Sequence, residues 1–314
     1  MTFFTSSRII IKMKEGEHVS KKKNAFAKLI VSMVIFGSIG IFVRNISLAS
    51  SAVAMVRAVV GTVFLFAVSI AKKKRFSVDS IKKHVPVLLF SGAALGFNWI
   101  LLFESYKFTS VAVSTLCYYT APIIVIFLSP LLLKERLTGR KLFCVIPAVL
   151  GMVFVSGILT SSMGESDWKG ILLGLGAAVL YATVVILNKM QADIPAFDRT
   201  VFQLGTAAIV LIPYNFAVSA FPQNLPDHMT LLLLLAVGVI HTGLAYYLYF
   251  SSMEHLEGQT MAIISYVDPV IAIAVSVFLL REKTSWQDIL GAVLILGAAV
   301  LSELPAKRKE RACD

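Results

Sequence analysis

Apolar residues follow one another along this chain in runs of about 20, the length that a membrane-spanning helix needs. The runs predict ten spans, at residues 26–43, 50–71, 85–103, 111–133, 141–159, 169–188, 200–220, 229–250, 260–280 and 288–304. The connections between them are short and leave no room for a soluble domain. We therefore predict an all-α integral membrane protein with ten transmembrane helices.

The chain also contains an internal repeat. Residues 96–137 recur as residues 243–284 with a constant offset of 147 and no gap, and 12 of the 42 aligned positions are identical. About four identities are expected by chance in so apolar a composition. Each copy carries a proline inside an apolar run, Pro122 or Pro269, and ends in a charged triplet. Doubled, proline-broken segments are typical of transporters.

The repeat divides the spans into two halves of five. We predict a basic tail at 1–25, a first five-helix repeat at 26–159, a second at 160–305, and another basic tail at 306–314. Because five is odd, the second repeat must enter the membrane upside down, which makes the two repeats inverted.

Composition and charge agree with a membrane location. Hydrophobic residues make up 57% of the chain, charged residues 15%, and the mean hydropathy is +0.82, which excludes a soluble globular protein. The net charge of +11 does not indicate nucleic-acid binding, because the basic residues cluster between spans. With both termini cytoplasmic, 23 Lys and Arg residues lie inside and 5 outside. This predicts the orientation in the cytoplasmic membrane.

Several of these features resemble a known family. They are the segments Pro122–Glu135 and Pro269–Glu282, each followed by a Gly-containing span, together with Arg57 and the Phe36-Gly37-Ser38 cluster. In them the chain resembles EamA-type transporters of the drug/metabolite transporter superfamily over essentially all its length after residue 25. The resemblance implies a ten-helix secondary transporter, often an exporter, with a central cavity lined mainly by spans 1, 3, 4, 6, 8 and 9.

Aromatic and amide side chains on spans 3, 4, 8 and 9 are the candidates for lining that cavity. Aromatic residues near helix ends usually form the interfacial belt, but Tyr118, Tyr119 and Tyr266 lie too deep for it. For a transporter we predict a small polar or aromatic metabolite as the substrate, with amino acids or their relatives the favoured class. The predicted substrate-binding residues are Asn98, Trp99, Tyr118, Tyr119, His241, Tyr246 and Tyr266.

Three charged or titratable residues inside spans need an explanation, because such groups are costly in a bilayer. Asp268 and His241 both lie roughly 18 Å from the outer side, so they could pair and carry a coupling proton. A static polar contact between helices is the alternative. Arg57 either reaches the outer interface or anchors helix carbonyls, or else its guanidinium group contacts a bound anion.

Pro122 and Pro269 are predicted to kink their helices and to flex during transport, although prolines are also ordinary in spanning helices. Glu135 and Glu282 end their spans beside basic residues and are predicted to be salt-bridged loop anchors. The three cysteines are widely spaced, and the sequence has no metal-binding pair and no phosphate-binding loop. We therefore predict no metal, no cofactor and no drive by ATP.

Three functions compete on these features. The first is a secondary transporter, favoured by the doubled broken helix. The second is an intramembrane enzyme, for which His241 and Asp268 are the only reactive group, with no serine or cysteine clearly placed to complete it. The third is a channel or a scaffold, but the polar residues are scattered over many spans instead of forming one continuous face. The predicted partners are a small-molecule substrate, the lipid bilayer and protons.

Overall fold

The computed structural model describes residues 2–105, 107–109, 114, 117–155, 167–220, 226–268, 270–271, 274, 278 and 286–303, and in these ranges it contains helices and no strand. The elements are α1 (Thr2–Arg44), α2 (Ser50–Ala71), α3 (Val78–Ser105), α5 (Ala121–Leu132), α6 (Gly139–Val155), α7 (Asp167–Met190), α8 (Ala196–Ala217), α9 (His228–Gly238), the π-helix η2 (Val239–Leu244), α10 (Ala245–Ser252), α11 (Gly258–Ser265) and α13 (Trp286–Glu303).

Six helices in the described ranges are long and apolar enough to cross a membrane, namely Ser20–Val43, Ser50–Ala71, Val78–Ser105, Trp168–Met190, Ala196–Ala217 and His228–Ser252. They match six of the predicted spans, although α1 and α3 begin earlier than hydropathy indicates. The remaining four predicted spans fall on α5, α6, α11, α13 and residues outside the described ranges. The chain is thus an all-helical, multi-pass membrane protein.

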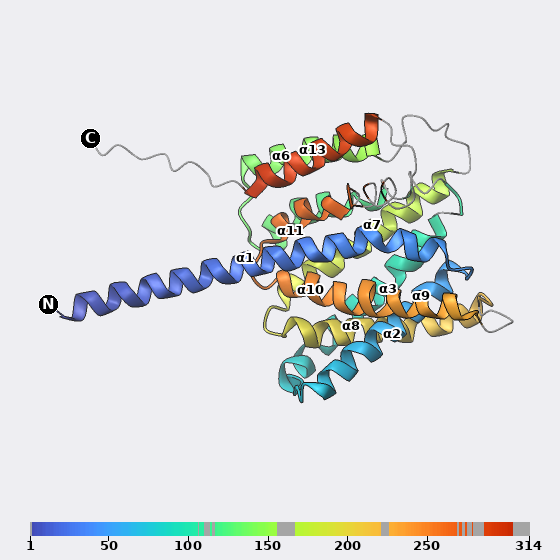
Figure 1. The fold of residues 1–314 in the computed structure, drawn as a ribbon, viewed down its shortest axis with the longest axis horizontal. Coiled ribbons are helices and arrows are strands. Elements are labelled where there is room, and N and C mark those ends of the chain that lie inside the picture. Colours follow the sequence, from blue (N-terminus) through green and yellow to red (C-terminus); the bar gives the residue numbers. More distant parts are fainter. Residues whose placement is uncertain are drawn as a thin grey trace.

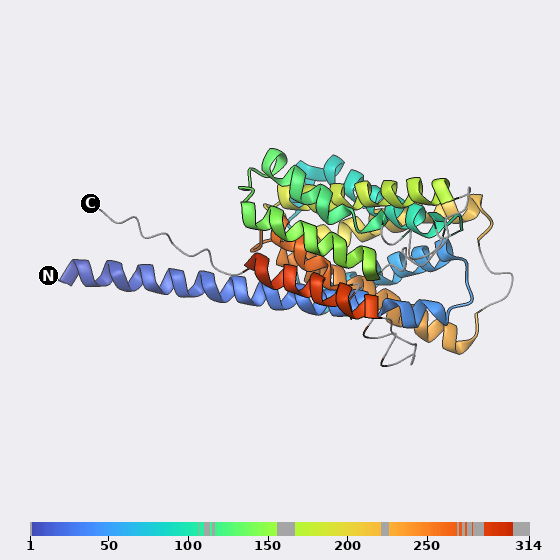
Figure 2. The same ribbon diagram turned by 90° about the horizontal axis from the view of Figure 1, so that it is seen from above.

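The helices form one bundle from which the first part of α1 projects (Figure 1 and Figure 2). Its outer face is apolar: Leu131 is 77% exposed and Ile209 is 69% exposed. Its interior holds polar side chains such as Asn98, Gln203 and Asn188, all almost fully buried. Polar groups confined to the interior behind an apolar exterior are what lipid requires, since such groups must find partners inside the protein.

The long helices pack closely because small residues lie between them. A Cβ atom added to Gly92 of α3 would lie 2.5 Å from Thr206 Cβ of α8, and one added to Gly170 of α7 would lie 2.4 Å from Thr109 Cγ2. At Gly151 of α6 it would lie 2.6 Å from the carbonyl oxygen of Gly291 in α13. These glycines set how near the backbones approach.

Contacts at the helix ends show that α2 and α8 run antiparallel. Lys74, just after α2, pairs with Asp198 at the start of α8 at 3.1 Å. At the other end of the same two helices, Asn215 Nδ2 donates to the carbonyl oxygen of Ser51 at 3.1 Å.

Most basic residues of the described chain lie at the end of the bundle that holds Lys74 and Asp198. We call it the basic end; it contains Lys72, Lys73, Lys74, Arg75, Lys82, Lys83, Lys134, Arg136, Arg140, Lys141, Lys189 and Arg199. At the opposite end, Asp227 caps α9. Hydrogen bonds from Thr230, through its side chain and its backbone N–H, lower the pKa of the Asp227 carboxyl.

Candidate functional site

The interior of the bundle is rich in aromatic side chains that contact one another. Trp99 of α3 donates its indole N–H to the hydroxyl of Tyr246 in α10 at 3.1 Å. The Tyr246 ring meets Phe36 of α1 edge-on, with centroids 5.1 Å apart, and Phe36 also contacts Tyr249. Trp99 and Tyr246, both predicted to line the cavity, are therefore brought together by the fold.

Arg57 lies over the Trp99 ring and does not reach the membrane interface. Arg57 is only 6% exposed, and its guanidinium carbon is 4.6 Å from the Trp99 ring centroid. Arg57 Nε donates to Thr242 Oγ1 at 3.0 Å. A charged side chain at the centre of a spanning helix costs about 2.5–3.5 kcal/mol. The buried position excludes one of the predicted alternatives, in which Arg57 extends to the outer interface.

The partner of Arg57 lies in a π-helix. The Thr242 hydroxyl donates to the carbonyl oxygen of Val237, five residues earlier, at 2.9 Å. This π-helix continues α9 into α10 without a turn, and Gly61 and Gly243 let it approach α2, because a Cβ at Gly61 would lie 3.0 Å from Thr242 Cγ2. Single π turns inside α-helices often occur at functional sites. The sequence pattern did not reveal this one.

We call Phe36, Trp99, Tyr246 and Tyr249 the aromatic cluster. Asn98 and Tyr118 lie next to it. Asn98 Nδ2 donates to the carbonyl oxygen of Ala177 at 2.7 Å, while Asn98 Oδ1 is buried with no partner in the described chain. Tyr118 lies beside Asn98, and its ring centroid is 5.6 Å from that of Tyr181 in α7. Tyr181 also stacks on Tyr249, so it belongs to the cluster. Sequence reasoning missed it, although its depth in an apolar run is the signal it used for Tyr118.

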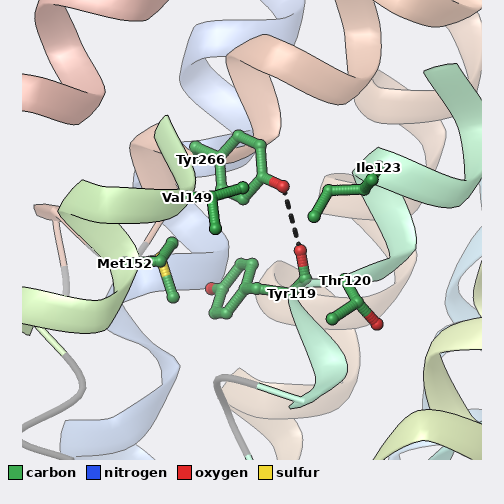
Figure 3. A pocket seen from close by; sticks show the side chains of 6 residues that line it. All are labelled: Tyr119, Thr120, Ile123, Val149, Met152 and Tyr266. Atoms are coloured by element: carbon green, nitrogen blue, oxygen red, sulfur yellow. Dashed lines mark hydrogen bonds between the residues drawn. The ribbon is translucent and has the colours of Figure 1, made fainter. Parts of the chain in front are cut away.

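Tyr119 and Tyr266 line a small pocket together with Thr120, Ile123, Val149 and Met152 (Figure 3). Its volume is about 30 Å³, enough for roughly two water molecules. The Tyr266 hydroxyl donates to the carbonyl oxygen of Tyr119 at 3.0 Å across it. That carbonyl precedes the start of α5, where the helical hydrogen-bond pattern is interrupted.

Pro122 lies in the first turn of α5, not in the middle of a kinked helix. Tyr119 and Thr120 form a turn, and α5 begins at Ala121. A proline in a first helical turn costs no hydrogen bond, because the amide there has no helical partner. The helix is thus interrupted at Tyr119 and Thr120, just before Pro122. Pro269 lies outside the described residues.

Asp268 and His241 do not contact each other, contrary to the predicted pair. The Asp268 carboxyl group lies beside the Tyr119 side chain. His241 Nε2 shares a hydrogen bond with Ser38 Oγ at 3.2 Å, and its ring packs on Phe42 at 4.5 Å. A Cβ at Gly37 would lie 2.6 Å from the carbonyl oxygen of Asp268. Because consecutive residues of α1 contact Asp268 and His241, this helix lies between them.

Glu135 joins three segments at the basic end. Its two carboxylate oxygens accept the backbone N–H groups of Gly258, at 2.7 Å, and Gln259, at 3.3 Å, at the start of α11. Lys189 Nζ at the end of α7 lies 3.7 Å from Glu135 Oε1 and also donates to the carbonyl oxygens of Met253 and Leu256. A carboxylate at a helix N-terminus is favourable, and here it also pairs with an ammonium group. Glu282 lies outside the described residues.

No group of three or more His, Cys, Asp or Glu side chains within the described ranges could hold a metal ion.

Comparisons with known proteins agree with this membrane architecture. The model of the EamA-like transporter family matches the chain twice, over residues 24–157 and 168–304. "Uncharacterized transporter YxxF" of Bacillus subtilis (strain 168) is 31% identical over 293 residues, which cover 92% of this chain and 93% of that protein. Protein PecM of Dickeya dadantii (strain 3937) is 24% identical over 211 residues, 65% of this chain and 68% of that protein.

A solved crystal structure shares the fold with a TM-score of 0.80 at 19% identity, over 91% of this chain and 99% of that one. Together with the two matches to one family model, the relative at 31% identity decides the assignment. This chain belongs to the EamA-like transporter family and is a membrane transporter, not an enzyme.

Proposed function

We propose that this protein is a secondary active transporter that exports small metabolites, such as amino acids, across the cytoplasmic membrane by alternating access. The observation that carries the proposal is that residues 147 positions apart touch each other in the middle of the bundle. Trp99 bonds Tyr246, and Tyr266 bonds Tyr119. Two equivalent residues can touch only near the axis that relates their halves.

The helix bounds support ten helices arranged as two inverted repeats, 26–159 and 160–305. α6 begins at Gly139 and α13 at Trp286, again 147 positions apart. α2 and α8 are equivalent within one position and run antiparallel, as inverted halves require. Inverted repeats supply two alternative gates around one central site.

The contacts at the basic end support the gating part of the proposal. Glu135 and Lys189 tie the loop after α5 to α7 and to the turn between α10 and α11. Nearby, Lys141 pairs with Glu257 and Glu254 accepts the backbone N–H of Ala196. In this conformation the basic end is the closed gate, and its charge favours the cytoplasmic side, with both termini cytoplasmic.

The topology predicts a labelling pattern for single cysteines in a cysteine-free background. A membrane-impermeant maleimide added to intact cells should spare a cysteine in the 134–141 loop and label one in the 281–287 loop. Permeabilised cells serve as the control, because both positions should then react. Labelling of both loops from the same side would contradict the inverted repeat.

Counterflow in proteoliposomes tests the transport function. Vesicles loaded with an unlabelled amino acid, nucleoside, sugar or cationic drug should accumulate the same labelled compound transiently for at least one member, with amino acids expected. Protein-free vesicles are the control. Flux that does not saturate and needs no internal substrate would indicate a channel. No counterflow with any class would contradict the proposal.

A further inference from the structure

Arg57 is a buried cation in the bundle interior. Its Nε donates to Thr242 Oγ1, and its guanidinium carbon lies over the Trp99 ring. Within the described ranges no carboxylate pairs with it, and its two terminal nitrogens have no hydrogen-bond acceptor. The side chain is therefore held at Nε and over Trp99, and its two terminal nitrogens are the donors left for another group.

Tyr246 and Tyr118 interact electrostatically with Arg57, and the Asp268 carboxyl group acts on the same two tyrosines. The Tyr246 hydroxyl oxygen accepts the Trp99 N–H, which leaves the hydroxyl proton available to donate. Trp99 thus holds Arg57 on its face and Tyr246 at its edge. Thr242 Oγ1 is already used twice, as acceptor from Arg57 and as donor to Val237. The two terminal nitrogens of Arg57 and the Tyr246 hydroxyl are thus the donors left around a buried cation, and they call for an anionic acceptor.

The surroundings limit what the rest of that ligand can be. Phe36, Tyr118, Tyr181 and Tyr249 continue the aromatic cluster from Tyr246. Aromatic faces of this kind pack an apolar or aromatic body. A single guanidinium group neutralises one charge and matches two coplanar oxygens, the geometry of a carboxylate.

We propose that Arg57 is the anion-binding residue of the transport site. Its ligand is a small monocarboxylate whose apolar or aromatic body packs on the aromatic cluster around Phe36 and Tyr246. This rests on the proposed transport function only in naming the ligand as a substrate. Thr242 and Trp99 are positioning residues: they fix the guanidinium group so that its two terminal nitrogens face the ligand.

The fluorescence of Trp99 can report binding at this site. The chain has three tryptophans, and the other two, Trp168 and Trp286, are 70% and 65% exposed. In purified full-length protein carrying Trp168→Phe and Trp286→Phe, the emission comes from Trp99. Phenylacetate should change that emission saturably. Phenylacetamide, which has the same shape without the charge, should bind roughly 10- to 100-fold more weakly, the usual effect of losing charged hydrogen bonds.

Substitutions of Arg57 test whether this residue causes the preference for the acid over the amide. Arg57→Gln should abolish the preference for the acid over the amide, and Arg57→Lys should retain part of it because the charge remains but the fork is lost. Arg75→Gln makes the same change at an exposed arginine after α2 and should bind like the parent. Size-exclusion profiles establish that each variant is folded. If Arg57→Gln does not fold, the comparison of acid and amide in the parent protein still decides.

Four binding results would overturn the proposal: no saturable response to phenylacetate, equal affinity for acid and amide, an unchanged preference in folded Arg57→Gln, or tighter binding of benzylphosphonate than of phenylacetate. The last would assign the site to organic phosphates. The assay uses no membrane and no gradient. Binding without any counterflow would therefore refute the proposed transport and keep the anion site. Counterflow of neutral compounds alone would keep the proposed transport and refute the anion site.

Discussion

Replacing Glu135 with alanine should open the basic end of the bundle. The change removes the acceptor for two backbone N–H groups of α11 and leaves Lys189 without its carboxylate. Charged hydrogen bonds contribute about 1.5–3 kcal/mol each, so the closed gate should lose at least roughly tenfold in population. Transport should fall by a similar factor, because the alternating access that we propose needs both closed states.

Labelling measures this gate directly. Gln259 is fully buried and its backbone N–H bonds Glu135, so in inside-out vesicles a Gln259→Cys reporter in a cysteine-free background should react slowly with an impermeant maleimide in the parent. Glu135→Ala should accelerate the reaction by about tenfold or more, and Glu135→Gln should lie between, since its amide oxygen can still accept. Asp193→Ala breaks an exposed pair with His84 at the same end and is the matched control. Equal labelling rates in Glu135→Ala and the parent would show that Glu135 does not hold this gate closed.

Asp268→Asn should abolish uptake driven by a pH gradient while substrate exchange continues. We propose that this residue carries the coupling proton, because its carboxyl group lies inside the membrane beside Tyr119 and its backbone touches Gly37 of α1. Asparagine keeps the size and the polarity but cannot exchange a proton. Exchange should survive because it moves no net proton.

The measurement compares gradient-driven uptake with counterflow in the same proteoliposomes. His241→Gln is the matched control: this residue is also buried and titratable, but it bonds Ser38 and not Asp268. We expect it to leave the pH dependence of uptake unchanged. Loss of counterflow in Asp268→Asn would indicate a substrate-binding or structural role, and a pH profile like that of the parent would exclude Asp268 from coupling.

The helical spans were predictable because hydropathy measures what a bilayer selects. The span expected at 50–71 coincides with α2, since four basic residues, Lys72 to Arg75, end the apolar run abruptly. The start of α1 was not predictable in this way. Residues 2–19 are polar enough to leave the membrane yet continue the helix, and hydropathy reports burial in lipid rather than helix formation.

The sequence by itself determined the membrane class, the family resemblance and the repeat, because each depends on composition, spacing or identity along the chain. Only the tertiary structure decided which residues meet. Equal depth suggested that Asp268 and His241 pair, but depth does not say which way a side chain faces, and α1 lies between them. Likewise, no local pattern distinguishes an arginine that reaches lipid headgroups from one held on Trp99 by a π-helix distant in sequence. Such contacts depend on how helices rotate and cross, which packing between distant segments sets.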